Sequence, residues 1–363
     1  MSNRLAALDP RLVRWKKDNV YGFLVIHAIA SLAIVPWFFS WTGVILLLVG
    51  LYVFGVLGIN LCFHRALTHR GLACPSWLER SFALLGVCCV QDSPPHWVAV
   101  HRKHHHHADD ELDPHSPLVS FFWAHMGWLL VRMESMKRSS LIERYAKDIM
   151  RDPFYAWLER RHNWLKVALL SWIAYFIGGF GYVALSGGAV SDATQFGLSL
   201  LIWGAVLRTV VVWHITWSIN SVTHLWGYRN YETPDVSRNN LLVALLSSGE
   251  GWHNNHHADP RSARHGHTRG EIDTTWMIIR LLILLGLAKN VALPSPGLAG
   301  KFSTAGFEPT PKQFDAFDVE NPTPPASDVA GNCTNPPVPI TRRLFEPDEF
   351  RPRDEEWRWH DRR

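Results

Sequence analysis

The stretch WTGVILLLVGLYVFGVLGINLCF, residues 41–63, contains no charged side chain and ends directly at His64. It reaches the ~20 residues that an α-helix needs to cross a bilayer. The overall composition hides this block, because hydrophobic residues make up an ordinary 47% of the 363 residues. We therefore read the fold from the positions of apolar blocks, and this one predicts a membrane span.

Three further apolar blocks of similar length predict additional spans at about residues 21–39, 167–185 and 196–220. Two shorter blocks, residues 81–90 and 276–287, predict buried or interfacial helices instead. The expected fold is all-α: an integral membrane, four-helix transmembrane bundle with a cytosolic helical cap that holds a histidine-rich site. We expect a cytosolic arm over residues 1–19, a membrane domain over 20–290, and an extended or disordered, Pro-rich tail over 291–363.

Lys and Arg residues flank the predicted spans on one side only, at Arg11, Arg14, Lys16, Lys17, Arg65, Arg70, Arg160, Arg161, Lys166 and Arg229. The short linkers on the other side, residues 39–43 and 186–192, carry neither residue type. By the positive-inside rule, both termini and the histidine-rich segments face the cytoplasm. The net charge of +4 without a basic run does not favour a nucleic-acid partner, and five scattered Cys fit a reducing compartment.

The protein has 20 His, and three clusters of them follow apolar blocks. They are His64-Arg65-Ala66-Leu67-Thr68-His69, His101-Arg102-Lys103-His104-His105 and His253-Asn254-Asn255-His256-His257. Positions i, i+3 and i+4 share one face of a helix, so each HxxHH presents three imidazoles to one side. Three adjacent rings serve two nearby ions more readily than one. The i, i+5 pair does not share a face of a straight α-helix, so we expect His69 beyond the helix end.

Asn220 and His224 share a face at the end of the fourth predicted span. They would emerge at the depth of His64, which suggests one site at the cytosolic mouth of the bundle. Imidazole ligands suit Fe, Cu, Ni and Zn. Surface His runs without function are the alternative, but several clusters on one side of the membrane favour a dinuclear metal site.

These residues resemble the membrane fatty acyl desaturases, in particular the stearoyl-CoA desaturase-like (acyl-CoA delta-9 type) branch. The resemblance covers about residues 20–290. It includes a Trp97–His101 spacing, Asp113-Pro114-His115, the segment 121–129, Thr216-Trp217 with Asn220 and His224, and Gly249-Glu250-Gly251-Trp252-His253. The segment 91–96 departs from the family pattern, and the run His104 to His107 leaves the register of the second cluster open.

The resemblance implies an enzyme, an oxidoreductase of fatty acid biosynthesis, that inserts a cis double bond into a fatty acyl group with O₂ as co-substrate and two Fe²⁺ ions. It places His64, His69, His101, His105 and His256 on one iron. It places His104, His224, His253 and His257 on the other, with Asn220 acting through a water. It also implies a separate electron donor of the ferredoxin, rubredoxin or cytochrome b5 type.

Side-chain acids and bases cannot break an unactivated C–H bond in the middle of a fatty acyl group, which agrees with a redox metal. The spans would enclose an acyl tunnel, with Trp97, Thr216 and Trp217 as wall candidates; plain helix packing is the alternative for Trp217. Arg208 within a span would pair with a carboxylate or cap the tunnel.

Other polar residues have simpler interpretations. His27 and His214 are expected to be packed polar residues, and Asp109, Asp110, Glu111 and Asp113 a solvated acidic turn. Asp113 and Glu250 are nevertheless candidates to hold a ligand His by its second nitrogen. Partners of the ligands or surface positions are expected at His96, His106, His107, His115 and His125.

Two other functions stay open at this stage. A membrane di-iron lipid or alkane hydroxylase would use overlapping clusters, and only the Asn220/His224 pattern and the Asp113-Pro114-His115 segment favour the desaturase. A membrane metal carrier or haem-binding protein should repeat polar residues through its spans, whereas here the His clusters lie at one end.

Overall fold

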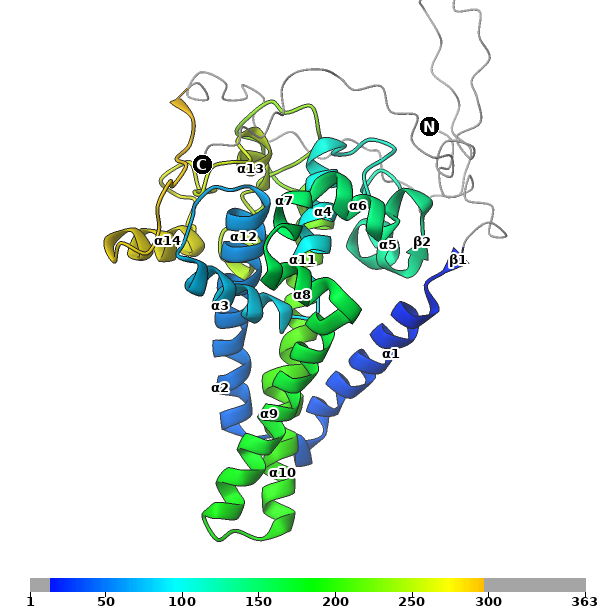
Figure 1. The fold of residues 1–363 in the computed structure, drawn as a ribbon, viewed down its shortest axis with the longest axis vertical. Helices are drawn as coiled ribbons and strands as arrows, with labels where there is room; N and C mark the ends of the chain where they lie inside the picture. The colour runs from blue at the N-terminus through cyan, green and yellow to red at the C-terminus, as the bar shows by residue number, and fades with distance from the viewer. Residues whose placement is uncertain (1–13, 297–363) are drawn as a thin grey trace, which may run out of the picture.

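The computed structural model describes residues 14–296; the predicted tail, apart from its first residues, and most of the predicted arm lie outside them. The described part consists mainly of helices joined by loops, and its one pair of two-residue strands, β1 (Arg14–Trp15) and β2 (Val131–Arg132), is antiparallel. Long helices extend toward one end of the molecule, and shorter helices gather at the other end (Figure 1). We call the shorter-helix region, residues 69–162 and 225–296, the head.

Within residues 14–296, three helical stretches are long and apolar enough to cross a membrane: Trp41–Thr68, Pro153–Leu185 and Val190–His224. The first joins α2 (Trp41–Gly50) to a π-helical segment, η3 (Leu51–Thr68). The second contains α8 (Pro153–Glu159) and α9 (Asn163–Leu185). The third joins α10 (Val190–Leu200), η7 (Leu201–Leu207), α11 (Arg208–Ser221) and η8 (Val222–His224). These stretches contain the spans expected at 41–63, 167–185 and 196–220.

The first expected span is shorter than predicted. Helix α1 covers only Lys17–Ser31, and two 3₁₀ turns follow it, Leu32–Ile34 and Pro36–Phe38. Val35 is extended, with φ −76° and ψ 122°, because the proline that follows disfavours helical geometry. A 15-residue helix is about 22 Å long, less than the ~30 Å hydrocarbon core. Three helices thus meet the length for crossing, where the sequence predicted four.

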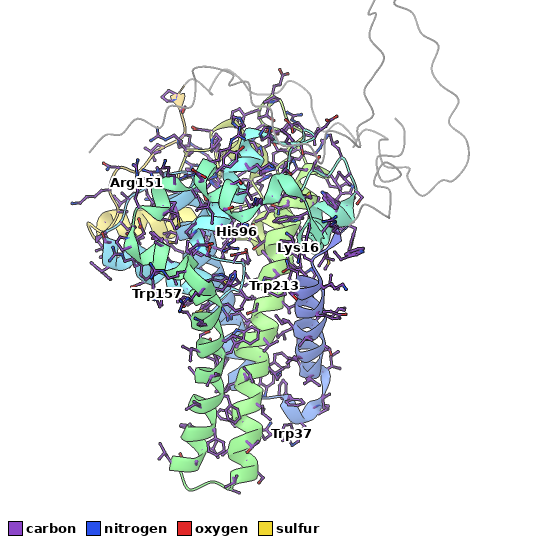
Figure 2. All side chains as sticks on the ribbon, turned by 45° about the vertical axis from the view of Figure 1, so that its right-hand side comes forward. Lys16, Trp37, His96, Arg151, Trp157 and Trp213 are labelled. Atoms are coloured by element: carbon purple, nitrogen blue, oxygen red, sulfur yellow. The ribbon has the colours of Figure 1, made fainter. Side chains whose placement is uncertain are left out.

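The long helices expose apolar side chains, as lipid-facing helices do. Leu170, Ile177 and Tyr182 of α9 are each at least 60% exposed. In Figure 2, Trp37 lies toward the lower end of the helices, whereas Lys16, His96 and Arg151 lie near or within the head. The labelled charges therefore lie at the head end of the molecule.

The head is built from short helices. They are α3 (Ser76–Val87), α4 (Pro94–His106), η4 (Trp123–Gly127), α5 (Trp128–Leu130), η5 (Glu134–Met136), α6 (Arg138–Tyr145), α7 (Lys147–Met150), α8, η6 (Arg160–His162), α12 (Leu241–Leu246), α13 (His253–Ala258) and α14 (Thr274–Leu284). The apolar blocks that were too short to span correspond to α3 and α14. Leu281 and Leu284 of α14 are exposed, and the helix lies across the axis of α2 (Figure 1). This agrees with an interfacial position.

Candidate metal centre

The end of η3 brings the first histidine pair together. His69 donates its backbone N–H to the carbonyl of His64 over 3.1 Å, an i→i+5 bond. This π-helical geometry stacks residue i+5 over residue i, which a straight α-helix does not do. The two ring centroids lie 4.8 Å apart. His69 does lie just past the helix end, as expected, but the π-helix is what aligns the pair.

The two HxxHH clusters are each divided between two groups of rings. Helix α4 begins after Ser93, whose hydroxyl accepts from the backbone N–H of His96, with prolines at its first positions. The cluster on α4 faces the cluster on α13. Within each group the ligand atoms lie within 4.8 Å of one another: the five-His group is His64, His69, His101, His105 and His256, and the four-His group is His104, His224, His253 and His257.

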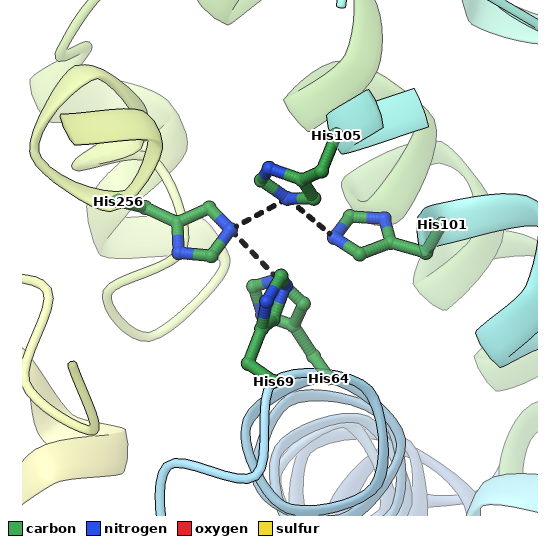
Figure 3. A group of neighbouring side chains, drawn as sticks. All are labelled: His64, His69, His101, His105 and His256. Atoms are coloured by element: carbon green, nitrogen blue, oxygen red, sulfur yellow. Dashed lines mark hydrogen bonds between the residues drawn. The ribbon is translucent and has the colours of Figure 1, made fainter. Parts of the chain in front are cut away.

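Ring nitrogens in both groups point at one another. In the five-His group, Nε2 of His256 lies 2.9 Å from Nε2 of His105 and 3.1 Å from Nε2 of His64 (Figure 3). In the four-His group, His253 and His224 approach to 3.0 Å through their Nε2 atoms. Two nitrogens that each bind one ion at 2.0–2.1 Å would lie at about such separations.

Buried carboxylates hold the opposite nitrogen of four rings. Nδ1 of each ring lies within hydrogen-bond distance of a carboxylate oxygen, and an ionised carboxylate can only accept. The pairs are His64–Glu250 at 2.7 Å, His104–Asp113 at 3.0 Å, His224–Asp109 at 3.1 Å and His257–Asp235 at 2.9 Å. The contacts of His104, His224 and His257 are hydrogen bonds, and each fixes the proton on Nδ1 and leaves the Nε2 lone pair directed at the centre of its group.

The positions of the ring protons show whether these histidines are suited to bind a metal ion. His104 and His257 each carry the proton on Nδ1, yet their Nε2 atoms face each other at 3.3 Å. Two lone pairs at that distance repel unless a cation lies between them. In the five-His group, Nε2 of His69 is buried without a hydrogen-bond partner. Both observations fit a metal ion, and an all-imidazole set suits iron, copper, nickel or zinc.

The electrostatics of the site agree with neutral imidazoles and charged carboxylates. Burial, followed by neighbouring imidazoles, lowers the pKa of His101, His105, His253 and His256. Burial alone would raise the pKa of Glu250, but Arg65 and the adjacent histidines hold it well below its usual range. Metal binding requires the neutral form of His, which burial favours at these four rings.

The acidic residues correct one expectation. Asp109 and Asp113 are buried in contact with His224 and His104, so these two do not belong to a solvated turn. Asp110 is exposed and bonds to His107, as expected of a surface residue. The candidate roles of Asp113 and Glu250 beside ligand rings agree with their positions.

Sequence reasoning missed Asp235, Asp109 and His265 as neighbours of the site. Asp235 follows Thr233-Pro234 in an irregular loop and has no helical spacing to any His. His265 is buried, with its ring 4.5 Å from that of His256 and its Nδ1 3.1 Å from Glu250. Only the tertiary fold brings these residues to the site, so no local sequence signal identifies them.

Other predicted positions are not ring members of the two groups. Asn220 is half-buried on α11, four residues before His224. His106 and His107 belong to neither group, whereas His104 and His105 belong to one group each. His96 pairs with Asp92 at 3.0 Å. His115 lies against His104, with ring centroids 4.3 Å apart.

The tunnel candidates occupy different places. Trp97 stacks on His101 at 5.1 Å and donates its indole N–H to Gln91, whose amide in turn donates to Thr216 over 2.9 Å. Thr216 also lines a cavity of about 170 Å³. Trp217 is buried against Trp213, with centroids 5.6 Å apart.

That cavity lies between α2, η3, α11 and α12. Its lining residues are Leu48, Leu51, Tyr52, Gly55, Val56, Asn60, Val212, Ile215, Thr216, Leu246, Ser247 and Ser248. Leu48 and Tyr52 are exposed on the outer surface, whereas Asn60 lies one turn before His64. The cavity therefore extends from the outside of the bundle toward the five-His group.

The predicted pairing of Arg208 with a carboxylate is wrong. Within residues 14–296 the guanidinium pairs with no carboxylate and does not line the cavity; it lies 3.9 Å from the ring centroid of Phe54 and donates to the carbonyls of Gly204 and Cys88. Cation–π and carbonyl contacts replace an ion pair here.

His27 and His214 are packed polar residues, as expected. Their Nε2 atoms lie 3.2 Å apart, and His214 continues to His125 at 3.0 Å. His125 in turn contacts the hydroxyl of Ser221.

Comparison with known proteins agrees with this geometry. A family model described as "Fatty acid desaturase" matches residues 11–269. The protein is 40% identical over 289 residues to the sn-2 palmitoyl-lipid 9-desaturase of Nostoc sp. (strain 36), covering 79% of its own length and 93% of the relative. It is 41% identical to the sn-1 stearoyl-lipid 9-desaturase of Anabaena variabilis, covering 76% and 93%. It is also 41% identical to the icosanoyl-CoA 5-desaturase of Limnanthes douglasii, covering 77% and 72%.

Proposed function

The protein belongs to the fatty acid desaturase family, whose members are oxidoreductases acting on fatty acyl groups, and we propose that it inserts a cis double bond into an acyl substrate at a di-iron centre formed by its nine grouped histidines. The observation that carries this proposal is the facing pair His104 and His257, whose Nε2 atoms lie 3.3 Å apart while carboxylates hold both Nδ1 protons. A cation between them removes the repulsion.

The histidine groups would hold one iron each. When bound, the irons supply the one-electron chemistry with O₂ that an unactivated C–H bond requires. His104, His224 and His257 keep their orientation because Asp113, Asp109 and Asp235 accept from their Nδ1 atoms, and Glu250 lies 2.7 Å from Nδ1 of His64. Asn220, four residues before His224, would hold a water beside the four-His group.

The acyl substrate would lie in the cavity between α2, η3, α11 and α12. Gln91 bridges Trp97 and Thr216, so a ring stacked on His101 is linked to the cavity wall. Trp97 and Thr216 would thus fix the substrate beside the five-His group. Trp217 packs one residue further along α11 and would support this wall.

The apolar helices and the charges that flank them indicate how the enzyme lies in the membrane. The three spans, together with α1 and its turns, would form a four-helix bundle in the bilayer, and the flanking Lys and Arg residues favour a cytoplasmic position for the head. A separate ferredoxin, rubredoxin or cytochrome b5 type protein would supply the electrons. The acyl carrier is either CoA or a membrane lipid, since relatives of both kinds match equally well.

Expression of the full-length protein in a host that lacks the activity, followed by fatty acid profiling, tests the proposal. Mass spectrometry should show an acyl product that has lost two hydrogens. A product that has gained oxygen would instead support a hydroxylase, which the desaturase names of the relatives do not favour. Unchanged fatty acids, with the protein present in the membrane, would contradict both activities.

A further inference from the structure

The two histidine groups differ in the charge that surrounds them. Three of the four rings in the four-His group are backed by a carboxylate: His104 by Asp113, His224 by Asp109 and His257 by Asp235. In the five-His group only His64 has such a partner, Glu250. The carboxylates at the four-His group thus outnumber those at the five-His group by three to one.

Basic residues increase this difference. Arg65 donates to Glu250 over 3.0 Å and to Asp273 over 2.9 Å, so one guanidinium lies between two carboxylates and the three groups carry one net negative charge. Within residues 14–296, no Lys or Arg forms an ion pair with Asp109, Asp113 or Asp235. The four-His group therefore faces three negative charges without a basic partner.

The structure stabilises the charged form of all three aspartates. Asp113 accepts backbone N–H groups of Asp109 and His115. Asp235 accepts from the hydroxyl of Thr233 and the backbone N–H of Ser237. Asp109 accepts from the backbone N–H of Val236 over 2.7 Å. Burial alone would raise the pKa of each carboxyl, but these bonds and the adjacent histidines lower it.

We infer that the two metal positions are unequal: the four-His position binds its divalent ion more tightly, because three carboxylates back its ligands, and the five-His position is the one that loads last and empties first. This inference rests on the proposed di-iron centre. A carboxylate behind a ligand His raises the basicity of that ring, and its loss typically weakens metal affinity ~10–100-fold. Three such carboxylate partners should add more to metal affinity than the one additional neutral imidazole of the five-His group.

The inference identifies Asp109, Asp113 and Asp235 as positioning residues for the four-His metal. They touch the ligands, not the metal or the substrate, so metal affinity is the property that they control. Substitution by Asn preserves size and an acceptor oxygen while it removes the charge.

Equilibrium dialysis of the full-length apoprotein in detergent against buffered free Fe²⁺, without oxygen, tests the inference. Bound iron per protein molecule should rise in two steps of one ion, separated by at least ~tenfold in free iron. Asp235→Asn should shift the tighter step ~10–100-fold to higher free iron and leave the weaker step in place. Glu250→Gln should move only the weaker step. Asp110→Asn, an exposed carboxylate in the same acidic segment, is the matched control and should change neither step.

The position of the first bound iron, measured on the wild-type protein, provides a second test. Anomalous scattering from wild-type protein at half saturation should place the ion at the four-His group. The inference would be overturned by anomalous density at the five-His group or by equal occupancy of the two groups. It would also be overturned if Glu250→Gln, and not Asp235→Asn, moved the tighter binding step. These outcomes would leave the di-iron centre intact. A wild-type protein that binds no iron would overturn the proposed function as well.

Discussion

The head and the long helices are stabilised in opposite ways. In the head and at the end of η3 that adjoins it, charged and polar groups are buried and paired: Arg65 of η3 donates to Glu250 and Asp273 of the head, and all three residues are below 7% exposed. In the long helices, apolar side chains such as Leu170 and Ile177 are exposed, as suits a lipid solvent. The membrane helices therefore position the site, whereas the polar contacts of the head determine its chemistry. Polar changes should therefore have their largest effects in the head.

The largest expected effect comes from the ligand rings. His101→Ala and His253→Ala each remove one ring from a different group and should abolish desaturation, with a loss of at least ~10³-fold. His106→Ala is the matched control, because His106 lies on the same helix α4 but in neither group. Fatty acid profiling of cells expressing each variant is the measurement. Activity retained by both ligand variants would refute the assignment.

The buried ion network should show the next largest effect, this time on stability. Arg65→Met leaves Glu250 and Asp273 buried without their cation, which should cost about 3–5 kcal/mol. Arg80→Met is the control, since its pair with Asp152 is partly exposed and such pairs contribute about 0–1 kcal/mol. The thermal midpoint of the detergent-solubilised protein, followed by tryptophan fluorescence, measures both. Equal shifts of the thermal midpoint in the two variants would contradict the expected difference between a buried and a partly exposed ion pair.

A change in the long helices should alter specificity more than stability. Gly55 lines the cavity, and an added Cβ would meet only Val212 at 3.5 Å, an ordinary contact. Gly55→Val should fill part of the cavity and lower activity on long acyl substrates relative to short ones by about tenfold, equivalent to ~1.4 kcal/mol. Gly22→Val, on α1 with open space around it, is the control. An unchanged length profile of the products would place the acyl substrate elsewhere.

The smallest expected effect is a pH dependence of head stability. Burial would raise the pKa of Asp92, but His96 and Arg138 hold it well below its usual range. A carboxyl with a depressed pKa stabilises the fold above its unfolded pKa of ~3.9 and loses that contribution as the pH falls further. The thermal midpoint should therefore fall below about pH 4. Asp92→Asn should be less stable at neutral pH and show a weaker fall in acid; an unchanged acid profile would count against this contribution.

Periodicity and spacing predicted much of the fold, because apolar length and HxxHH spacing are local properties. The sequence identified three long helices and the nine histidines that the structure brings together. It overestimated α1, because the block that begins at Tyr21 continues past Pro36 although the helix ends at Ser31. It could not anticipate that η3 is π-helical and stacks His69 over His64, or that Asp235 reaches His257. These features depend on tertiary contacts between segments far apart in the sequence.

Metal analysis of the purified full-length protein tests the central claim most directly. Elemental analysis should find two irons per folded protein molecule. His101→Ala and His253→Ala should each reduce this number, while His106→Ala should retain both irons. A folded wild-type protein that contains one iron, none, or a haem would contradict a centre built from two converging groups of imidazoles.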